Sequence, residues 1–473
     1  MLIRCYRVHS RLISNVTDVS MNVYSDILDM VGKTPMLEVT HIDTGPCRLF
    51  LKLELMNPGG SIKDRIGISM IAEAEKRGDI KPGDTIVEAT AGNTGLGLAL
   101  VAAQKGYQLI LVLPDKMSQE KIFNLRAMGA EVVLTRSDVG RGHPEYYQDL
   151  GKHIADERGA YFINQFGNPD NPLAHEQTTA PEIVEQMGGD LDAIVLGVGS
   201  SGTVSGIGRY LQENAPHVDL ILADPVGSVL ADYINTGELG EKGSWLVEGI
   251  GEDFIPSIAN FSQVAKAYAI TDADSFAAAR ELLRKEGVLA GSSSGTLLCA
   301  ALRYCREQTE RKTVVTFACD TGNKYLSKLF NDFWMEDQGF IEREQFGDLR
   351  DLVGRPHKEH ATITVGRTDV LTTAHNRLRN AGFSQLPVMD DGNLVGVVTE
   401  DAIIQFVYGK PELMNANVED AMESAFIKLD RTESMNNLVA MLRVQPYAAI
   451  MDGEEFVGLI TRSDVLNYLR RQI

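Results

Sequence analysis

Length, composition and charge already narrow what this chain can be. It has 473 residues, of which 44% are hydrophobic and 23% charged, and a formal net charge of −20. That length allows two or three domains with a large buried core, and the composition is ordinary for a globular protein. The negative charge argues against nucleic acids and anionic membranes as partners, and no apolar run is long enough to span a bilayer.

The number and spacing of the cysteines, and the composition of the N-terminal segment, indicate the cellular compartment of the protein. The five cysteines form no Cys-x-x-Cys pair, and their odd number fits a reducing cytoplasm better than a disulfide framework. No His or Cys cluster has zinc-ligand spacing, so no metal site is expected. Residues 1–20 carry three arginines before the first acid, Asp18, which could mimic a transit peptide. We favour a disordered extension ahead of a natural start at Met21, because chain termini are usually poorly ordered.

Helical and strand patterns alternate from Tyr24 to Asp320. Strands are expected at Arg48–Leu53, Thr85–Ala89, Gln108–Leu113, Glu131–Thr135, Asp192–Val198, Leu220–Ala223 and Thr313–Phe317, and helices at Gln119–Met128 and Ser275–Glu286. Several of these strands are continuously apolar, as a sheet buried on both faces requires. The pattern predicts an α/β fold, with a largely parallel sheet and helices on both faces.

An internal repeat follows the charged and aromatic stretch Asp332–Arg350, which we interpret as a linker without strands. Leu386–Gly392 leads into Leu394–Thr399, and Tyr447–Gly453 leads into Phe456–Thr461. Each unit predicts a strand, an Asp-Gly turn, a second strand and a helix. Two such units can pair and bury a face that neither could bury alone.

A lysine lies in a glycine-rich turn at the predicted start of a helix, within Gly59–Arg65. A lysine amine can form a Schiff base with a carbonyl cofactor and then act as a general base. Alone, Lys63 could equally be a solvated surface lysine. Further along, Thr90–Gly95 forms another strand-to-helix turn of small polar residues. That turn could grip a substrate carboxylate, or it could merely cap its helix.

Two later glycine- and serine-rich turns add to this picture. Gly197–Gly206 follows a predicted strand and opens a helix, so its backbone N–H groups and hydroxyls could bind phosphate. It lacks the lysine of a Walker loop, and its glycine spacing is poor for a dinucleotide fingerprint, so a tight turn without a ligand stays open. In Gly291–Thr296 a serine could hydrogen-bond a pyridine nitrogen, or it could simply cap the expected helix Leu297–Arg303.

Together these segments resemble the motifs of pyridoxal-phosphate enzymes of fold type II, the class of the tryptophan synthase β-subunit. Within that class the chain is similar to the cystathionine β-synthase and cysteine synthase family. Asn57–Arg65 matches the cofactor-lysine motif, Gly92–Gly95 the substrate loop and Gly199–Thr203 the phosphate loop, while Val247–Pro256 resembles the form found in cystathionine synthases.

The resemblance implies a core of two αβα subdomains that binds pyridoxal 5′-phosphate, and an assembly that is a homodimer or a higher homo-oligomer. The implied domains are an extension over residues 1–20, a catalytic core over 21–345, a linker over 346–359 and a tandem CBS (Bateman) module over 360–473. Lys63 is the implied catalytic residue. The implied cofactor-binding residues are Lys63, Asn93, Gly199, Ser200, Ser201, Gly202, Thr203 and Ser293. The implied substrate-binding residues are Thr90, Ala91, Gly92, Thr94, Gln165, Glu248 and Gly251.

Four positions depart from the pattern of the family. Ala91 stands where serine is usual, Ser201 where glycine is usual, Phe166 where animal synthases carry tyrosine, and Glu252 where an aromatic residue is common in eukaryotic relatives. These departures leave the cofactor motifs intact and bear on substrate preference. The N-terminal segment has no Cys-Pro haem-ligand pattern, so haem is not expected.

The paired repeats resemble modules that often bind adenosyl ligands. In such modules an acidic residue, three positions after a Thr or Ser, binds the ribose. Thr461 and Asp464 keep this spacing, whereas Thr399 is followed by Ala402. One site for S-adenosylmethionine or AMP is therefore favoured over two. The alternative is that Asp464 only caps the following helix and that the module mediates assembly.

The resemblance implies a β-replacement that condenses L-serine with L-homocysteine to give L-cystathionine and water. This reaction belongs to transsulfuration and cysteine biosynthesis. Release of hydrogen sulfide from cysteine is implied as a side activity. The main alternative is an O-acetylserine sulfhydrylase, which makes cysteine from sulfide, and a serine or threonine deaminase is more distant. A different class is a regulatory nucleotide-binding protein with an inactive core. The intact Lys63, Asn93 and Ser293 argue against that class.

Overall fold

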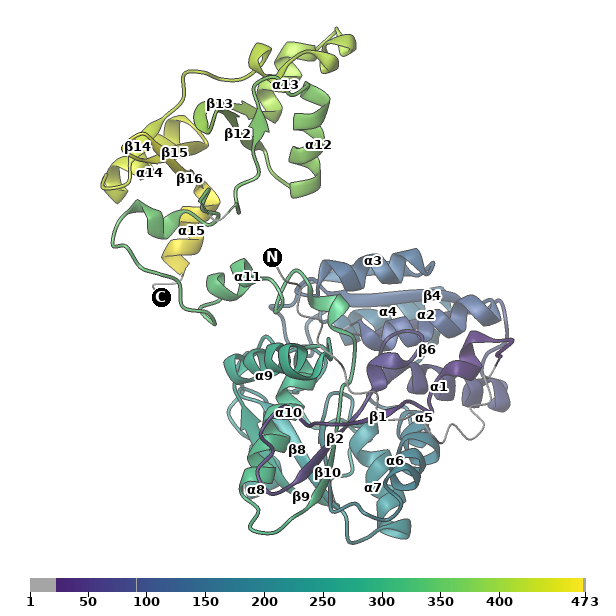
Figure 1. Cartoon of the computed structure of the whole chain (residues 1–473). Coiled ribbons are helices and arrows are strands. Elements are labelled where there is room, and N and C mark those ends of the chain that lie inside the picture. The colour runs from purple at the N-terminus through teal and green to yellow at the C-terminus, as the bar shows by residue number, and fades with distance from the viewer. Residues whose placement is uncertain (1–22, 91, 359, 471–473) are drawn as a thin grey trace. The chain divides into compact units, whose positions relative to one another are not determined.

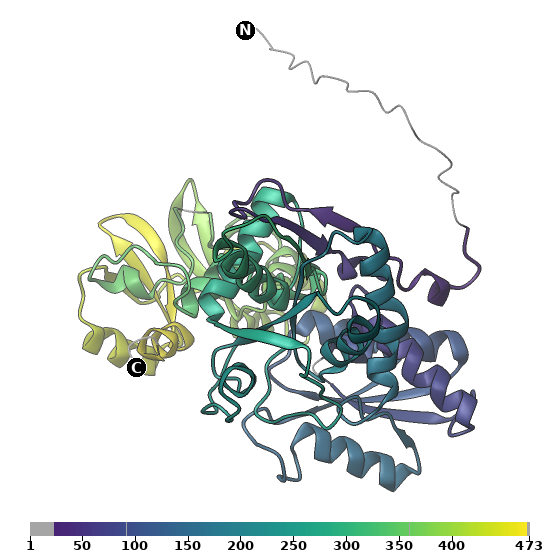
Figure 2. The ribbon, with the colours of Figure 1, turned by 90° about the horizontal axis from the view of Figure 1, so that it is seen from below.

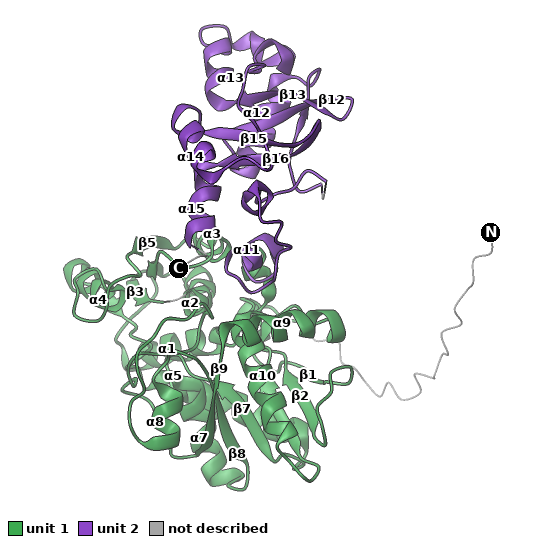
Figure 3. Ribbon diagram, turned by 90° about the vertical axis from the view of Figure 1, so that its left-hand side faces the viewer, with its two compact units in different colours: residues 1–326 green, residues 327–473 purple. Residues whose placement is uncertain are grey.

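The computed structural model describes residues 23–90, 92–358 and 360–470, and it divides into two compact units (Figures 1 and 3). Unit 1 spans residues 1–326 and unit 2 spans residues 327–473. The expected N-terminal extension, with Met21, and the substrate-loop residue Ala91 lie outside the described residues. The domain boundaries expected at 345/346 and 359/360 stay predictions.

Unit 1 contains two sheets. The larger has the order β1-β2-β10-β7-β8-β9, in which only the β1–β2 pair is antiparallel. The smaller has the order β5-β4-β3-β6 and is parallel throughout. The bounds are β1 Met36–Glu38, β2 Arg48–Lys52, β3 Thr85–Ala89, β4 Gln108–Pro114, β5 Glu131–Thr135, β6 Tyr161–Phe162, β7 Ala193–Gly197, β8 Asp219–Pro225, β9 Val264–Ile270 and β10 Thr313–Phe317.

Every strand expected in unit 1 is present, so the α/β prediction is confirmed, and the parallel strands divide between two sheets. The central strands β7 and β10 are almost wholly buried, in agreement with their continuous apolar runs. Strands β1, β6 and β9 were not predicted. The first two are very short, and β9 is an edge strand with an exposed lysine, Lys266, in its middle.

Helices flank both sheets (Figure 2). Their bounds are α1 Lys63–Arg77, α2 Asn93–Lys105, α3 Gln119–Ala127, α4 Tyr147–Arg158, α5 Asp170–Ala174, α6 Ala180–Met187, α7 Gly202–Asn214, α8 Leu230–Thr236, α9 Asp272–Glu286 and α10 Ser292–Arg306, with a π-helix at His175–Thr179 and 3-10 turns at Ile27–Met30, Glu54–Met56 and Gly322–Tyr325. The expected helix Leu297–Arg303 is longer than predicted, because its first turn includes the serines that were placed in a preceding loop.

Two glycines let α1 and α2 cross at close range. A Cβ on Gly67 would lie 2.7 Å from the Gly97 carbonyl carbon, and one on Gly97 would lie 2.6 Å from the Lys63 carbonyl oxygen. No other residue type fits such a crossing without displacing backbone. The crossing brings the first residue of α1, Lys63, close to the start of α2, where Asn93 is the first residue.

Unit 2 contains the two predicted repeats. Its sheets have the orders β11-β12-β13 and β14-β15-β16. The bounds are β11 Val365–Gly366, β12 Gln385–Asp390, β13 Asn393–Thr399, β14 Lys428–Asp430, β15 Tyr447–Asp452, β16 Glu455–Thr461, α11 Asp332–Asp337, α12 Leu371–Ala381, α13 Glu400–Val407, α14 Met435–Val444 and α15 Arg462–Arg470, with 3-10 turns at Leu349–Leu352, Pro411–Asn415 and Val418–Asp420.

The repeat prediction is confirmed in detail. Each repeat has the expected hairpin followed by a helix, and both hairpins carry a register shift at the same position, after Val388 and after Ile450. Leu394 from one repeat packs in a buried cluster with Ala449 and Phe456 from the other, which is the shared face that the pattern predicted. Among the described residues of the chain, no helix combines the length and the apolar character needed to cross a membrane.

Candidate active site

Lys63 begins α1 and lies in a half-buried position. Burial is the main cause that lowers the pKa of its amine, and the nearby Cys319 and Glu252 act against that shift. Among the described residues, Nζ has no hydrogen-bond partner. A buried amine with a lowered pKa and no partner is what a cofactor-binding, proton-transferring lysine requires, and a solvated surface lysine would not show the lowered pKa.

Cys319 connects Lys63 with the serine expected at the ring nitrogen. Its thiol interacts with Lys63 and makes a side-chain hydrogen bond with Ser293, and burial raises its pKa to about 12. Ser293 is 5% exposed and lies in the first turn of α10, whose N-cap is Gly291. No side chain caps this helix, so capping does not account for the serines. Ser292 and Ser294 instead accept backbone N–H groups from Glu248 and Cys319.

The segment Gly199–Thr203 forms a buried turn at the start of α7. Ser201 has φ +67°, a left-handed conformation that favours glycine, which is the usual residue of the family here. A Cβ on Gly199 would lie 2.8 Å from the Gly249 carbonyl oxygen, and one on Gly202 would lie 1.8 Å from Asn171 Oδ1. The turn is therefore packed closely at Gly199 and Gly202, where no larger residue fits without displacing a neighbour.

This turn fits a phosphate group. Within the described residues, the N–H groups of Gly202, Thr203 and Val204 have no acceptor, as expected for the free N-terminus of a long helix. The hydroxyls of Ser200, Ser201 and Thr203 lie in the same buried turn, at 3–8% exposure. Free N–H donors and buried hydroxyls form a suitable cradle for the phosphate of pyridoxal phosphate.

This cradle is held by Asn171 and His175, which end a segment that resembles the synthases but were not predicted as site residues. Asn171 Nδ2 donates to Ser200 Oγ at 3.0 Å and to the Gln165 carbonyl at 2.8 Å. His175, the first residue of the π-helix, places Nε2 3.2 Å from Thr203 Oγ1 and Nδ1 2.9 Å from Thr179 Oγ1. Burial keeps the pKa of His175 well below its usual range, so the ring is neutral. Single-turn π-helices are frequent at functional sites.

The expected substrate loop is assembled at the start of α2. Thr94 Oγ1 donates to Gln165 Oε1 at 2.8 Å, which joins two residues far apart in the sequence. Thr90 Oγ1 accepts the Gly92 N–H at 3.1 Å. Gly92 has φ +115°, and a Cβ there would lie 2.8 Å from Lys121 Cδ. The structure thus brings Thr90, Gly92, Thr94 and Gln165 into one buried cluster.

Asn93 lies between two charged residues. Its Nδ2 donates to Asp320 Oδ2 at 2.7 Å, and its Oδ1 accepts from Lys324 Nζ at 3.0 Å. The sequence analysis assigned no role to either partner.

Glu248 and Gly251 lie on the loop beside these elements. Glu248 Oε2 accepts from Lys121 Nζ at 2.7 Å, and both side chains are buried. Gly251 has φ +88° and donates its N–H to the Val198 carbonyl at 2.8 Å, so it packs beside the phosphate turn. On the same loop, burial raises the pKa of Glu252 well above its usual range, and Lys63 opposes that shift.

In unit 2, Asp464 contacts Thr461 as a cap would. Asp464 Oδ2 accepts the Thr461 N–H at 2.7 Å and the Thr461 hydroxyl at 2.6 Å. Its Oδ1 accepts no hydrogen bond from the described residues. One carboxylate oxygen therefore orders the start of α15, while the other stays available to a ligand.

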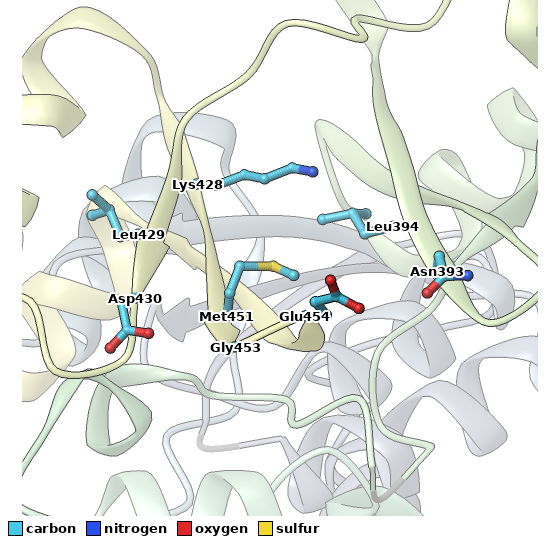
Figure 4. A pocket seen from close by; sticks show the side chains of 8 residues that line it. All are labelled: Asn393, Leu394, Lys428, Leu429, Asp430, Met451, Gly453 and Glu454. Atoms are coloured by element: carbon cyan, nitrogen blue, oxygen red, sulfur yellow. The ribbon is translucent and has the colours of Figure 1, made fainter.

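A pocket of about 460 Å³ lies between the two hairpins of unit 2 (Figure 4). It is lined by Asn393, Leu394, Lys428, Leu429, Asp430, Met451, Gly453 and Glu454. Neither Thr461 nor Asp464 is among these residues, so this pocket is separate from the position expected for an adenosyl ligand.

Comparison with known proteins agrees with this geometry. A family model described as "Pyridoxal-phosphate dependent enzyme" matches residues 27–320, and the CBS domain model matches residues 358–409 and 418–471. The chain is 35% identical to cystathionine beta-synthase from Apis mellifera, over 95% of this chain and 91% of that protein. It is 36% identical to the Mus musculus protein of the same name, over 91% of this chain and 78% of that protein.

A solved structure extends the comparison. The O-acetylserine dependent cystathionine beta-synthase from Helicobacter pylori is 40% identical and has a TM-score of 0.60, with 65% of this chain and 99% of that chain covered. The fold and the site together define a pyridoxal-phosphate dependent enzyme with a C-terminal CBS pair, a module that commonly binds adenosyl ligands. More narrowly, the chain belongs to the cystathionine beta-synthase family. The predicted enzyme class and cofactor are thereby confirmed.

Proposed function

We propose that this enzyme condenses L-serine with L-homocysteine to give L-cystathionine and water. The observation that carries the proposal is that the ring-nitrogen serine and the phosphate turn are both linked to the surroundings of Lys63. Cys319 interacts with its amine and with Ser293 on one side, and the neutral ring of His175, whose pKa Lys63 helps to lower, contacts Thr203 of the phosphate turn on the other. The family's relatives are named for this reaction.

The described residues divide the work of the reaction. Bound pyridoxal phosphate supplies an electron sink that stabilises negative charge at the substrate Cα. Lys63 removes the Cα proton and later returns it, and the burial that lowers its pKa favours the neutral amine, which is the form that acts as a base. Gly199–Thr203 bind the phosphate, and Asn93 and Ser293 hold the ring. Thr90, Gly92, Thr94 and Gln165 bind the substrate carboxylate.

Mass spectrometry of the products tests this proposal. Purified enzyme is given serine plus homocysteine and, separately, O-acetylserine plus sulfide. Cystathionine is expected to form faster than cysteine. Faster cysteine formation would make the enzyme an O-acetylserine sulfhydrylase. In a third reaction, O-acetylserine plus homocysteine, faster cystathionine formation than from serine would change only the donor, as in the name of the Helicobacter pylori relative.

A regulatory role belongs to the C-terminal module. We propose that Asp464 Oδ1 and Thr461 hold the ribose of one adenosyl ligand, S-adenosylmethionine or AMP. Replacing Asp464 by Asn is expected to weaken binding by about tenfold or more, because a hydrogen bond to a carboxylate contributes about 1.5–3 kcal/mol. Isothermal titration calorimetry measures this, with Asp401→Asn, on the exposed start of α13, as the control.

The outcomes of this titration are distinct. No heat with either ligand in the unaltered chain would leave Asp464 as a helix cap and the module as an assembly element. Heat that persists unchanged in Asp464→Asn would move the ligand to another surface, of which the pocket beside Lys428 is one.

Three further assignments accompany the function. We propose that the enzyme works in the cytoplasm, as a homodimer or a higher homo-oligomer, and that residues 21–345 form the catalytic region. The partners are small-molecule amino acids, and no nucleic acid or membrane partner is proposed. Light scattering of the purified holoenzyme would measure the oligomeric state.

A further inference from the structure

The ammonium group of Lys324 is buried among three neutral acceptors. Lys324 is 3% exposed and lies in the 3-10 turn Gly322–Tyr325. Its Nζ donates to the Gly59 carbonyl at 3.0 Å, the Gly60 carbonyl at 3.2 Å and Asn93 Oδ1 at 3.0 Å. A protonated lysine has three N–H donors, so each donor has one acceptor. Such a complete set is formed only by the charged form of the amine.

These acceptors belong to the two loops that meet at the site. Gly59 and Gly60 belong to the turn that leads into Lys63, and Asn93 begins α2. Gly60 has φ +74°, and a Cβ there would lie 3.0 Å from Thr321 Cγ2 and 3.5 Å from Lys324 Nζ. The turn Gly59–Gly60 therefore has no side chain at the point where the Lys324 ammonium binds its carbonyl groups.

Lys324 also fixes which way the Asn93 amide points. Its Nζ contacts the amide oxygen, while Asp320 Oδ2 accepts one proton of the amide nitrogen at 2.7 Å. A flipped amide would direct N–H groups at the ammonium and its oxygen at the carboxylate, so this network assigns the orientation. The amide nitrogen keeps one N–H that neither residue uses. That remaining donor is the one that Asn93 would offer to the cofactor ring.

Charged groups of both signs surround Lys324. It is faced by Asp64 from α1, by Asp320 from the loop after β10 and by Lys121 from α3. Lys121 is paired with Glu248, and it also donates to the Tyr325 hydroxyl at 3.0 Å, which in turn donates to Asp320 at 2.7 Å. Asp64 Oδ2 accepts the Gly59 N–H at 2.5 Å, so Gly59 is held at both its N–H and its carbonyl.

We propose that Lys324 is a positioning residue that joins the Lys63 turn to Asn93 and so sets the donor that Asn93 presents to the cofactor. The proposal rests on the proposed function for the identity of the cofactor and not for the identity of the substrates.

The arrangement is sensitive to pH. Burial lowers the pKa of Lys324 to about 8, with Lys121 acting in the same direction and Asp320 and Asp64 acting against it. Above that pH the amine loses its charge and one of its donors, and Asn93 is held less firmly. The pKa is depressed in the folded state, so the unfolded chain binds more protons above pH 8. The contribution of Lys324 to the free energy of unfolding therefore does not fall as the pH rises. Only the contacts of Lys324 within the site weaken.

The test uses holoenzyme of the unaltered chain and of Lys324→Met and Lys324→Gln, with Lys81→Met, at an exposed position, as the control. The absorbance of the bound cofactor is recorded from about pH 6.5 to 9.5, and cofactor release is timed by dialysis. A step near pH 8 is expected in the unaltered chain and in Lys81→Met, and it is absent in both Lys324 variants. Cofactor release is expected to be about ten- to hundredfold faster in Lys324→Met, the range for a charged hydrogen bond.

A double variant separates positioning from general stability. Adding Lys324→Met to Asn93→Ala is expected to change the cofactor spectrum no further, because the proposal assigns the effect of Lys324 on the cofactor ring to the Asn93 amide. Additive changes would overturn the proposal, as would a spectrum of the unaltered enzyme that is flat across pH 8. Circular dichroism melts confirm that each variant is folded. If the products differ from cystathionine while these spectra behave as stated, the proposed function fails and this proposal stands.

Discussion

Replacement of Lys63 by alanine is expected to lower β-replacement by at least about 10³-fold and to abolish the absorbance of covalently bound cofactor. A positioned acid–base group contributes about 10²–10⁴-fold, and the covalent anchor is lost with it. The other buried lysine beside this turn, Lys324, does not duplicate Lys63, because its three donors are occupied by Gly59, Gly60 and Asn93. Product formation followed by mass spectrometry and a visible spectrum of the protein measure the two effects.

Two companion variants make the Lys63 result specific. Lys63→Arg keeps a positive charge but cannot act as a base, so it is expected to be as inactive as alanine. Lys76→Ala removes a lysine from the exposed face of the same helix and is expected to keep full activity. Turnover that survives in Lys63→Ala, or that is restored by arginine, would remove Lys63 from the reaction.

The second large effect is expected at Gly202. An alanine there would place its Cβ 1.8 Å from Asn171 Oδ1, well inside contact distance. Asn171 is fully buried and holds both Ser200 and the Gln165 carbonyl, so it cannot move aside cheaply. We expect Gly202→Ala to lose about 3 kcal/mol or more of stability, at the upper end for overpacking, and to bind the cofactor poorly. Urea unfolding and the bound-cofactor absorbance report these two losses.

The same helix offers a matched control. A Cβ on Gly208 would meet Leu220 Cδ1 at 3.5 Å, which is ordinary contact. Gly208→Ala is therefore expected to leave the cofactor site unchanged and to stabilise α7 by up to about 1 kcal/mol, the gain in helix propensity. Equal behaviour of the two alanine variants would show that the contact between Gly202 and Asn171 is not what constrains the turn.

Periodicity and turn chemistry were enough to predict most of the fold. The continuous apolar runs located β7 and β10, and the Asp-Gly turns located both hairpins of unit 2, because these signals are local in the sequence. The start of α10 was misplaced, since Ser292 and Ser293 are poor helix formers and serine usually lies outside a helix or at its cap. Here packing against the loops at Glu248 and Cys319 overrides that preference.

The site was predictable only where a motif is contiguous. Lys63, the turn Gly199–Thr203 and Ser293 could be found from short patterns and a family resemblance. Lys324 and His175 could not, because their partners at the site, Asn93 and Thr203, lie far from them in the sequence. A lone lysine or histidine has no pattern that reveals such a partner, and a buried charge is identified only once the surrounding acceptors are in place.

His175 bears on how the phosphate turn responds when the pH falls. A histidine this close to a phosphate cradle would ordinarily gain a proton near pH 6.5 and strengthen anion binding as the pH falls. Burial holds the pKa of His175 well below that range, so its bond with Thr203 is unchanged through mild acid stress. The contact between His175 and the phosphate turn is thereby expected to be independent of pH in this range. A response to pH is expected instead at the turn before Lys63, where burial raises the pKa of Asp64 to about 7 and lowers that of Lys324 to about 8.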